Sequence, residues 1–524
     1  MGVSALLVTL FGPLVGSLAI LFIQRDQAAA IKRTALAFSC VTFVMSLLMI
    51  PSFDASNTAL QFVINQPWIP AIDAGFQIGV DGISLPLVLL TALIMPIALL
   101  ASFDPIHKSV KEYYVLMLLL QFGMTGVFVA WDTFLFYVFW ELILIPMYFI
   151  IGIWGGKDRI YAAIKFFLYT LVGSLLMLVA IVWLGLESHW AGHGFTADLT
   201  KLQVIGSQLG FNVQQFLFWA FAISFLIKVP LFPLHTWLPD AHVQAPTAGS
   251  VILAGVLLKL GTYGLIRFNL GLFPQASVHF AELISVFAVI GIVYGALVAM
   301  VQTDIKKLVA YSSVSHLGFV VLGIFSVTTE GIQGAVLQMV NHGISTPMLF
   351  LCVGVLYERR HTREIADYGG ITKVMPRFAV LFAIAMFASV GLPGLNGFVG
   401  EFLTLLGAFK SATLGSQVYA IVSASGVIFA AVYLLWMFQR VMFGTNDNAE
   451  NHHLRDLNRS EYWQLVPLAL LCIWLGVNPK PLMNFSEQGV KAVVQWVSDP
   501  AKSAPTITTG AAKTEAHHST NTHR

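Results

Sequence analysis

Long apolar runs separated by short polar segments make up most of this sequence. Each run holds about 20 residues, the length that an α-helix needs to cross a hydrocarbon core of ~30 Å. The pattern therefore predicts an all-α, polytopic membrane protein with about fourteen transmembrane helices. The predicted spans are residues 3–23, 31–52, 82–103, 113–131, 133–153, 161–185, 214–235, 248–270, 281–301, 308–327, 331–357, 378–409, 418–441 and 462–478.

Positively charged residues occur mainly in every second loop between these spans. One set of loops carries most of the Lys and Arg residues, around positions 25–33, 108–111, 157–159, 306–307, 359–377 and 440–459. The other set, before the C-terminal segment, carries only Lys201 and Lys410. Because cytoplasmic loops are enriched in Lys and Arg, we predict that the first set is cytoplasmic. An even number of spans then places both termini on the outer, periplasmic side of a bacterial inner membrane.

The composition agrees with a bilayer as the main solvent. Hydrophobic residues make up 57% of the chain and charged residues 10%, against about 45–50% and about 25% in soluble domains. The net charge of +2 gives no basis for nucleic-acid binding. The sequence contains neither a Rossmann G-x-G-x-x-G between strand and helix nor a P-loop. We therefore expect this chain to bind no nucleotide, flavin, iron–sulfur cluster or metal of its own.

Several ionisable residues fall inside the predicted spans, where a charge costs at least ~2.5–3.5 kcal/mol. They are Glu141, Lys228, Lys259, His316, His342 and Glu401. Each lies on a different span, which favours a lateral proton relay at half-membrane depth. Two alternatives remain open: Glu141 and Lys228 form a structural ion pair, and the two histidines serve only as hydrogen bonds between helices. Arg267, near the end of its span, is predicted to extend its charge to the membrane surface.

Two of the spans contain helix-breaking residues next to a buried ionisable group. Pro230 and Pro233 follow Lys228, and Gly391, Pro393, Gly394 and Gly397 precede Glu401. Proline removes a backbone hydrogen bond and glycine loosens the turn, so both helices are predicted to break at depth. Paired broken helices are typical of transporters built from inverted repeats. Lys228 and Glu401 are then expected at equivalent positions of the two repeats.

The spans and breaks divide the chain into segments. Residues 1–112 hold three N-terminal spans, 113–270 a first five-span repeat (spans 4–8), 281–441 a second five-span repeat (spans 9–13), and 462–478 the last span. Residues 479–524 are predicted to form a short interfacial helix and then a disordered tail rich in Ser, Thr, Ala and Lys.

Long motifs carry a family resemblance. The stretch HTWLPDAHVQAPTAGSVILAGVLLKLGTYG at 235–264 resembles the signature of the antiporter-like membrane subunits of respiratory complex I and of multisubunit cation/proton antiporters. Residues 136–156 and 303–323, with NHGISTPMLFLCVG and GLPGLNGFVGEF, are similar to further blocks of that family. The resemblance implies fourteen spans with two inverted five-helix repeats. An acidic residue at Glu401, where relatives usually carry Lys, resembles the subunit M branch.

The resemblance also implies roles. Glu141 would be the charged partner of Lys228, Lys228 the switchable group, Lys259 and His316 the central connection, and Glu401 the terminal group, with His342 extending the route. The implied protein is a non-redox, proton-translocating subunit of NADH:quinone oxidoreductase. NADH, FMN, iron–sulfur clusters and quinone would bind in partner subunits, and other membrane-arm subunits would contact two opposite faces.

Two other functions stay possible at this point. One is a subunit of a multisubunit Na⁺/H⁺ antiporter, which the acidic Glu401 disfavours. The other is a purely structural membrane scaffold for a hydrogenase-like complex, which the row of ionisable residues disfavours. Purification from membranes in mild detergent would separate the three, because NADH-oxidising partners should be isolated with the chain only in the first case.

Overall fold

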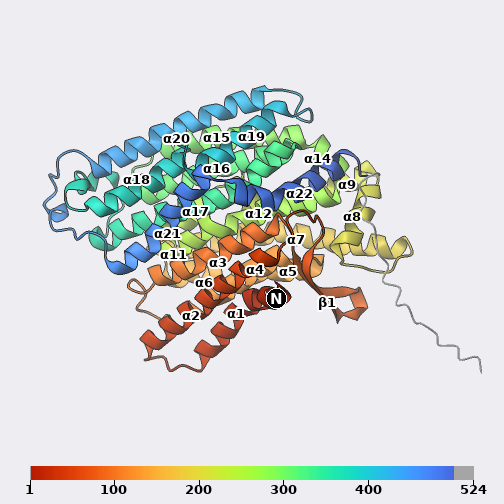
Figure 1. The fold of residues 1–524 in the computed structure, drawn as a ribbon, viewed down its shortest axis with the longest axis horizontal. Helices are drawn as coiled ribbons and strands as arrows, with labels where there is room; N and C mark the ends of the chain where they lie inside the picture. Colours follow the sequence, from red (N-terminus) through yellow and green to blue (C-terminus); the bar gives the residue numbers. More distant parts are fainter. Residues whose placement is uncertain (1, 501–524) are drawn as a thin grey trace, which may run out of the picture.

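The computed structural model describes residues 2–500 as a bundle of long helices running in roughly one direction, with α17 passing through its middle (Figure 1). The helices are α1 (Gly2–Leu21), α2 (Ala28–Leu47), α3 (Ser84–Ala101), α4 (Val110–Val129), α5 (Thr133–Leu142), α6 (Leu144–Trp154), α7 (Arg159–Trp190), α8 (Leu199–Gln208), α9 (Phe211–Lys228), α10 (Trp237–Gln244), α11 (Thr247–Ile252), α12 (Leu258–Gly264), α13 (Leu270–Leu272), α14 (Pro274–His279), α15 (Ala281–Met300), α16 (Ile305–Phe325), α17 (Thr329–Arg360), α18 (Pro376–Val390), α19 (Asn396–Lys410), α20 (Val418–Met442), α21 (Arg459–Val477) and α22 (Lys480–Ser498). Two π-helical segments, η3 (Leu253–Leu257) and η4 (Leu265–Asn269), join α11, α12 and α13 into one continuous rod.

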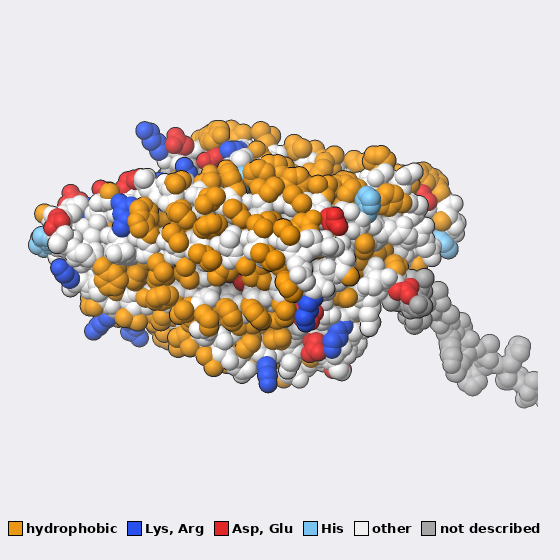
Figure 2. Space-filling view, turned by 90° about the horizontal axis from the view of Figure 1, so that it is seen from above, with side chains coloured by type: hydrophobic (Ala, Val, Ile, Leu, Met, Phe, Trp, Pro, Cys, Tyr) orange, Lys and Arg blue, Asp and Glu red, His pale blue; other side chains and the backbone are white. Residues whose placement is uncertain are grey.

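Thirteen helical rods among the described residues are long and apolar enough to cross a membrane. They match the predicted spans except 378–409, which is divided into α18 and α19 of 15 residues each. Hydrophobic side chains cover the middle of the molecular face in Figure 2, and charged side chains lie mainly toward its two ends. The chain is therefore a multi-pass membrane protein, as predicted.

Both predicted helix breaks are present. Helix α9 ends at Lys228, and residues 229–236, which include Pro230 and Pro233, are not helical. Helix α18 ends at Val390, and α19 begins at Asn396 after Gly391 and Gly394, both with positive φ. Lys228 is thus the last residue of the first half of its broken helix, whereas Glu401 lies in the second half of its broken helix. The expectation that the two residues occupy equivalent positions is wrong.

The centre of the bundle consists of α16, α17 and the α11–α13 rod. The most apolar stretches of α17 and of the rod are buried throughout and that of α16 nearly so, whereas α2, α20 and α21 expose most of theirs. Glycines let the backbones approach closely: a Cβ on Gly407 of α19 would lie 2.3 Å from the Cα of Gly331 in α17, and one on Gly343 of α17 would lie 2.8 Å from the carbonyl oxygen of Gly255. Such small-residue contacts fix the spacing of membrane helices.

Contacts between loops define two ends of the bundle. At the basic end, Lys111 donates to the Ile23 carbonyl, and Arg363 pairs with Asp304. This end gathers the loops 22–27, 102–109, 155–158, 301–304, 361–375 and 443–458. The opposite, hairpin end holds Lys201, beside Asp73, and Lys410, beside Glu330. The two sets of loops that the Lys and Arg distribution separated therefore lie at opposite ends.

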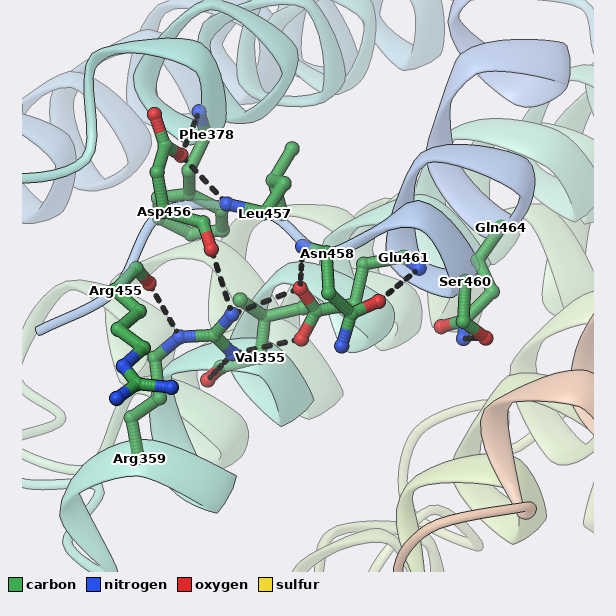
Figure 3. A network of polar contacts seen from close by, with 10 residues as sticks. All are labelled: Val355, Arg359, Phe378, Arg455, Asp456, Leu457, Asn458, Ser460, Glu461 and Gln464. Atoms are coloured by element: carbon green, nitrogen blue, oxygen red, sulfur yellow. Dashed lines mark hydrogen bonds and ion pairs between the residues drawn. The ribbon is translucent and has the colours of Figure 1, made fainter.

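Arg359 connects α17, the loop that precedes α21, and α21 itself at the basic end (Figure 3). Its guanidinium, at the end of α17, forms a bidentate pair with Glu461 of α21 at 2.7 and 2.8 Å. The same group donates to the Arg455 carbonyl at 2.7 Å, and Asn458 and Glu461 form a capping box that starts α21. Bidentate, charge-assisted hydrogen bonds are strong and directional, so this network sets how α21 joins the central helix.

The hairpin end contains structure that the sequence did not predict. Strands β1 (Gln61–Ile69) and β2 (Ala74–Val80) form an antiparallel hairpin, so the fold is mostly helical rather than all-α. The predicted short interfacial helix is the longer α22, whose Trp496 Nε1 donates to the Gly271 carbonyl at 2.8 Å. The N-terminal helix also begins here, since Gly2 packs on Phe62. The predicted disordered tail lies outside the described residues, apart from Pro500.

Candidate functional site

The six predicted site residues lie on six separate segments, and five of them are buried. Lys228, Lys259, His316, His342 and Glu401 expose between 0% and 3% of their surface, and Glu141 is partly exposed. Glu141 lies one residue before the end of α5, next to the interruption at Ile143. Lys259 lies in α12, His316 in α16, His342 in α17 and Glu401 in α19. Five of the six predicted residues are therefore buried inside the protein, and Glu141 is not.

Lys259 and His342 are in direct contact. The Lys259 ammonium donates to Nδ1 of His342 at 2.7 Å and also to the Ala254 carbonyl, which belongs to η3. Lys259 is bracketed by the two π-helical segments, and such segments occur frequently at functional sites. The widened turn places a backbone carbonyl within reach of the lysine head group.

His316 and Glu401 form the second direct contact. Nδ1 of His316 lies 2.6 Å from Oε1 of Glu401, and the Gln338 amide donates to the same oxygen at 3.0 Å. The break before α19 lies directly beside this carboxylate, because a Cβ on Gly391 would lie 3.4 Å from Oε2 of Glu401. A buried carboxylate is thus supported by an imidazole and an amide.

The two contacts meet at the histidines. The ring centroids of His316 and His342 are 5.9 Å apart, and Nε2 of each ring has no hydrogen-bond partner among the described residues. We call Lys259, His342, His316 and Glu401 the buried row. Its spatial order differs from the order along the chain, since His342 lies between Lys259 and His316. His342, expected to extend the route, thus lies between its two central members.

Glu141 and Lys228 do not form the direct ion pair that would join two helices. Within the described residues, no contact of 4.0 Å or less joins them, and neither the Lys228 ammonium nor Oε1 of Glu141 has a hydrogen-bond partner. The Lys228 ammonium instead lies 5.0 Å from the Trp140 ring and 5.7 Å from the Phe166 ring. Glu141 still acts on Lys228 through space, as its principal counter-charge. A glue role for this pair is therefore disfavoured.

Lys228 lies next to the rod that carries Lys259. A Cβ on Gly261 of α12 would lie 2.6 Å from the Phe225 carbonyl and 3.0 Å from the Val229 nitrogen, at the end of α9. Because Val229 follows Lys228, the close packing at Gly261 brings the break in α9 beside the row. The Glu141–Lys228 end and the buried row thus occupy adjoining helices.

The prediction for Arg267 is wrong. Its guanidinium is buried, pairs with Asp81, and lies 4.5 Å from the Trp131 ring and 5.4 Å from the Tyr263 ring. A carboxylate from the turn before α3 reaches the end of the rod and neutralises the charge there. An arginine with an internal partner has no need to extend to the membrane surface.

Sequence reasoning missed two polar residues near the row. Gln338, on α17, lies four residues before His342, and this spacing puts both on one helix face. His242 is fully buried, stacks on Phe350 with centroids 4.6 Å apart, and lies close enough to Lys259 to interact with its charge. Its place in the quoted HTWLPDAH motif was the available signal.

Comparison with known proteins reveals similarity over nearly the whole chain. Residues 130–429 match the family described as "NADH:quinone oxidoreductase/Mrp antiporter, TM", and residues 13–127 match "NADH-ubiquinone oxidoreductase chain 4, amino terminus". The chain is 46% identical to NADH-quinone oxidoreductase subunit M of Rickettsia conorii over 482 residues, which cover 91% of this chain and 96% of the relative.

Solved structures give the same result for the fold. A chain of respiratory complex I from Thermus thermophilus superimposes with a TM-score of 0.82 at 31% identity, covering 95% of this chain and 99% of that one. A chain of the Mrp complex from Dietzia sp. DQ12-45-1b superimposes with a TM-score of 0.81 at 18% identity, covering 95% and 98%. The latter likeness extends to the fold alone.

Proposed function

Because this chain belongs to the subunit M family of NADH-quinone oxidoreductase, we propose that its buried row carries protons across the membrane while partner subunits perform the electron transfer. The chain is thus a subunit of an oxidoreductase complex and contributes a proton path to it. NADH, FMN, iron–sulfur clusters and quinone are assigned to the partners. Lys259, His342, His316 and Glu401 form the path, and Glu141 and Lys228 form its loading end.

The observation that carries this proposal is the contact sequence from Lys259 through the two histidines to Glu401. Each member can gain and lose a proton, and each lies on a different helix near the middle of the bundle. A relay needs neighbouring groups within hydrogen-bond reach, or one bridging group apart. Two contacts of 2.7 and 2.6 Å separated by a gap of 5.9 Å between ring centroids supply this spacing.

We also assign the orientation of the chain in the membrane and the faces that contact neighbouring subunits. The basic end is assigned to the cytoplasm and the hairpin end, with both termini, to the periplasmic side of a bacterial inner membrane. Other membrane-arm subunits are assigned to two opposite faces. The exposed apolar side chains of α7 and α20 support such contacts, for example Leu168 and Val172 on α7 and Ile421 and Ile428 on α20.

Substitution of Lys259 tests the relay. Lys259→Ala removes the titratable group, and Lys259→Arg keeps a cation that does not release its proton. Both variants should lose most quinone-coupled NADH oxidation and proton translocation, while NADH oxidation by an artificial soluble acceptor survives. The control is Lys201→Ala, which removes an exposed lysine at the hairpin end. Full proton translocation in Lys259→Ala, normalised to artificial-acceptor activity, would exclude the row as the path.

Purification separates this proposal from the antiporter alternative. Isolation of the tagged chain in mild detergent should also yield flavin-containing and iron–sulfur partners that oxidise NADH. A complex without these partners that exchanges Na⁺ for protons would instead support the alternative.

A further inference from the structure

A buried ion pair lies on the outward side of the row. Arg267 follows Lys259 by eight residues on the same rod, which places it roughly 12 Å farther toward the hairpin end. Its guanidinium pairs with Asp81, and the exposed fractions of the two side chains are 7% and 6%. The pair stands between the row and the hairpin-end surface, and the relay has no evident use for it.

The pair is held rigidly on the carboxylate side. Oδ1 of Asp81 accepts hydrogen bonds from the Ile83 and Ser84 nitrogens at 3.1 and 2.9 Å, and Oδ2 binds Arg267. Helix α22 covers this turn, because a Cβ on Gly82 would lie 1.9 Å from the Phe485 carbonyl oxygen. The carboxylate therefore has all its main acceptor sites engaged.

The arginine side is closed by aromatic rings. Trp131 and Tyr263 lie 4.5 and 5.4 Å from the guanidinium carbon. The Trp131 ring is fixed by a hydrogen bond from Nε1 to the Thr200 hydroxyl at 2.9 Å. The Tyr263 hydroxyl donates to the Phe128 carbonyl at 3.3 Å. The same hydroxyl also interacts with the Arg267 guanidinium, which cannot accept a proton, so Tyr263 offers no onward step while Arg267 is present.

From this geometry we propose that the Arg267–Asp81 pair is an outward seal, which stops protons from leaving Lys259 directly toward the hairpin end and directs them along the row. This inference rests on the proposed function. Guanidinium stays protonated in proteins, so it can neither accept nor release a proton. A fixed cation in a pore also repels an approaching proton. Asp81 is the only acid in the pair, and its carboxylate is bound to Arg267 and so does not accept a proton.

The seal makes an asymmetric prediction for two substitutions. Arg267→Gln removes the cation and leaves Asp81 as an unpaired buried carboxylate, so that Tyr263, one turn after Lys259 on the rod, can bridge Lys259 and Asp81 and provide the missing outward step. Asp81→Asn removes the acid and keeps the cation, so no step appears. The double variant Arg267→Gln/Asp81→Asn has neither charge and again provides no step. A purely structural pair predicts no such pattern.

The test uses the whole complex in inverted membrane vesicles. The measured quantity is the ratio of NADH-driven proton uptake, from quenching of a pH-sensitive dye, to quinone-coupled NADH oxidation. Arg267→Gln should lower this ratio by at least about two-fold, while Asp81→Asn and the double variant keep the parental ratio. Artificial-acceptor activity reports the amount of assembled complex in each preparation.

Three results overturn the seal: an unchanged ratio in Arg267→Gln, a lowered ratio in Asp81→Asn, or an equal loss in all three variants. If Arg267→Gln does not assemble, Asp81→Asn and the double variant can still refute the seal, because a leak in either contradicts it. A parental complex without NADH-driven proton uptake would instead refute the proposed function, so the two failures are distinguishable.

Discussion

Glu141→Gln should lower quinone-coupled turnover and proton translocation together. The substitution keeps the shape of the side chain and most of its hydrogen-bonding capacity while removing its charge. The Lys228 ammonium is buried, faces the Trp140 and Phe166 rings, and has no hydrogen-bond partner among the described residues. Its charged form therefore depends on Glu141 acting through space. Without that charge, the buried Lys228 ammonium is left with no compensating charge, which is costly inside a bilayer.

The size of the effect follows from the separation of the two groups. They are more than 4.0 Å apart, since no ion pair joins them. At an effective dielectric constant of ~20, two unit charges 4 Å apart attract by about 4 kcal/mol, which is an upper limit here. Loss of Glu141 therefore removes up to about 4 kcal/mol of attraction from the charged Lys228, and about 1.4 kcal/mol corresponds to a tenfold change. We expect turnover to fall at least about tenfold.

The assay compares quinone-coupled NADH oxidation and proton translocation, each normalised to artificial-acceptor activity in the same membranes. Glu141→Asp keeps the charge and should retain more activity than Glu141→Gln. The control is Glu112→Gln, which removes a carboxylate exposed at the basic end, where it pairs with Arg25 at 2.8 Å. If normalised values are unchanged in Glu141→Gln, the switch role is refuted. A loss of all activities in proportion to the amount of complex would indicate a packing role.

Two further predictions concern assembly and topology. Arg359→Met leaves Glu461 without its bidentate partner and should destabilise the contact between α17 and α21 by about 2–4 kcal/mol. The loss should be seen as less assembled complex and a lower thermal midpoint in detergent. The control variant Arg455→Met keeps the backbone carbonyl of that network and should resemble the parent. A reporter fused within residues 358–377 should be cytoplasmic and one fused after residue 480 should lie outside, and the reverse result at either position would contradict the assignment of the two ends.

The helices and their breaks could be predicted because they depend on local chemistry. Apolar runs of membrane length define the spans, and the clustered Pro and Gly residues around Pro230 and Gly391 interrupt helices, whereas the single Pro347 does not. The site residues could be predicted for a similar reason. A charge such as that of Lys259 is costly in an apolar run, so its mere presence marks it for function or for pairing.

The features that depend on which helices meet could not be predicted. His342 contacts Lys259 although 83 positions separate them along the chain, because α17 packs between the rod and α19 with glycines at the contacts. The partner of Arg267 is Asp81, far away along the chain and outside the predicted run of buried ionisable groups. Strands β1 and β2 are mixed in polarity and show no regular alternation, so their sequences resemble an ordinary loop.

Along the proposed proton path, pairs of residues in direct hydrogen-bond contact alternate with pairs that are farther apart. This arrangement indicates where proton transfer can be controlled. Lys259 with His342, and His316 with Glu401, are in direct hydrogen-bond contact, with backbones held close by glycine packing. A proton shared across a contact of 2.6–2.7 Å moves without rearrangement of helices. Among the described residues, the gaps are between Glu141 and Lys228, between Lys228 and Lys259, and between the two histidine rings. Transfer across a gap requires a side-chain movement or a bridging group, and both depend on the surroundings. Of the six residues only Glu141 is partly exposed, so the proposed control by partner subunits would act most directly at the gap beside it.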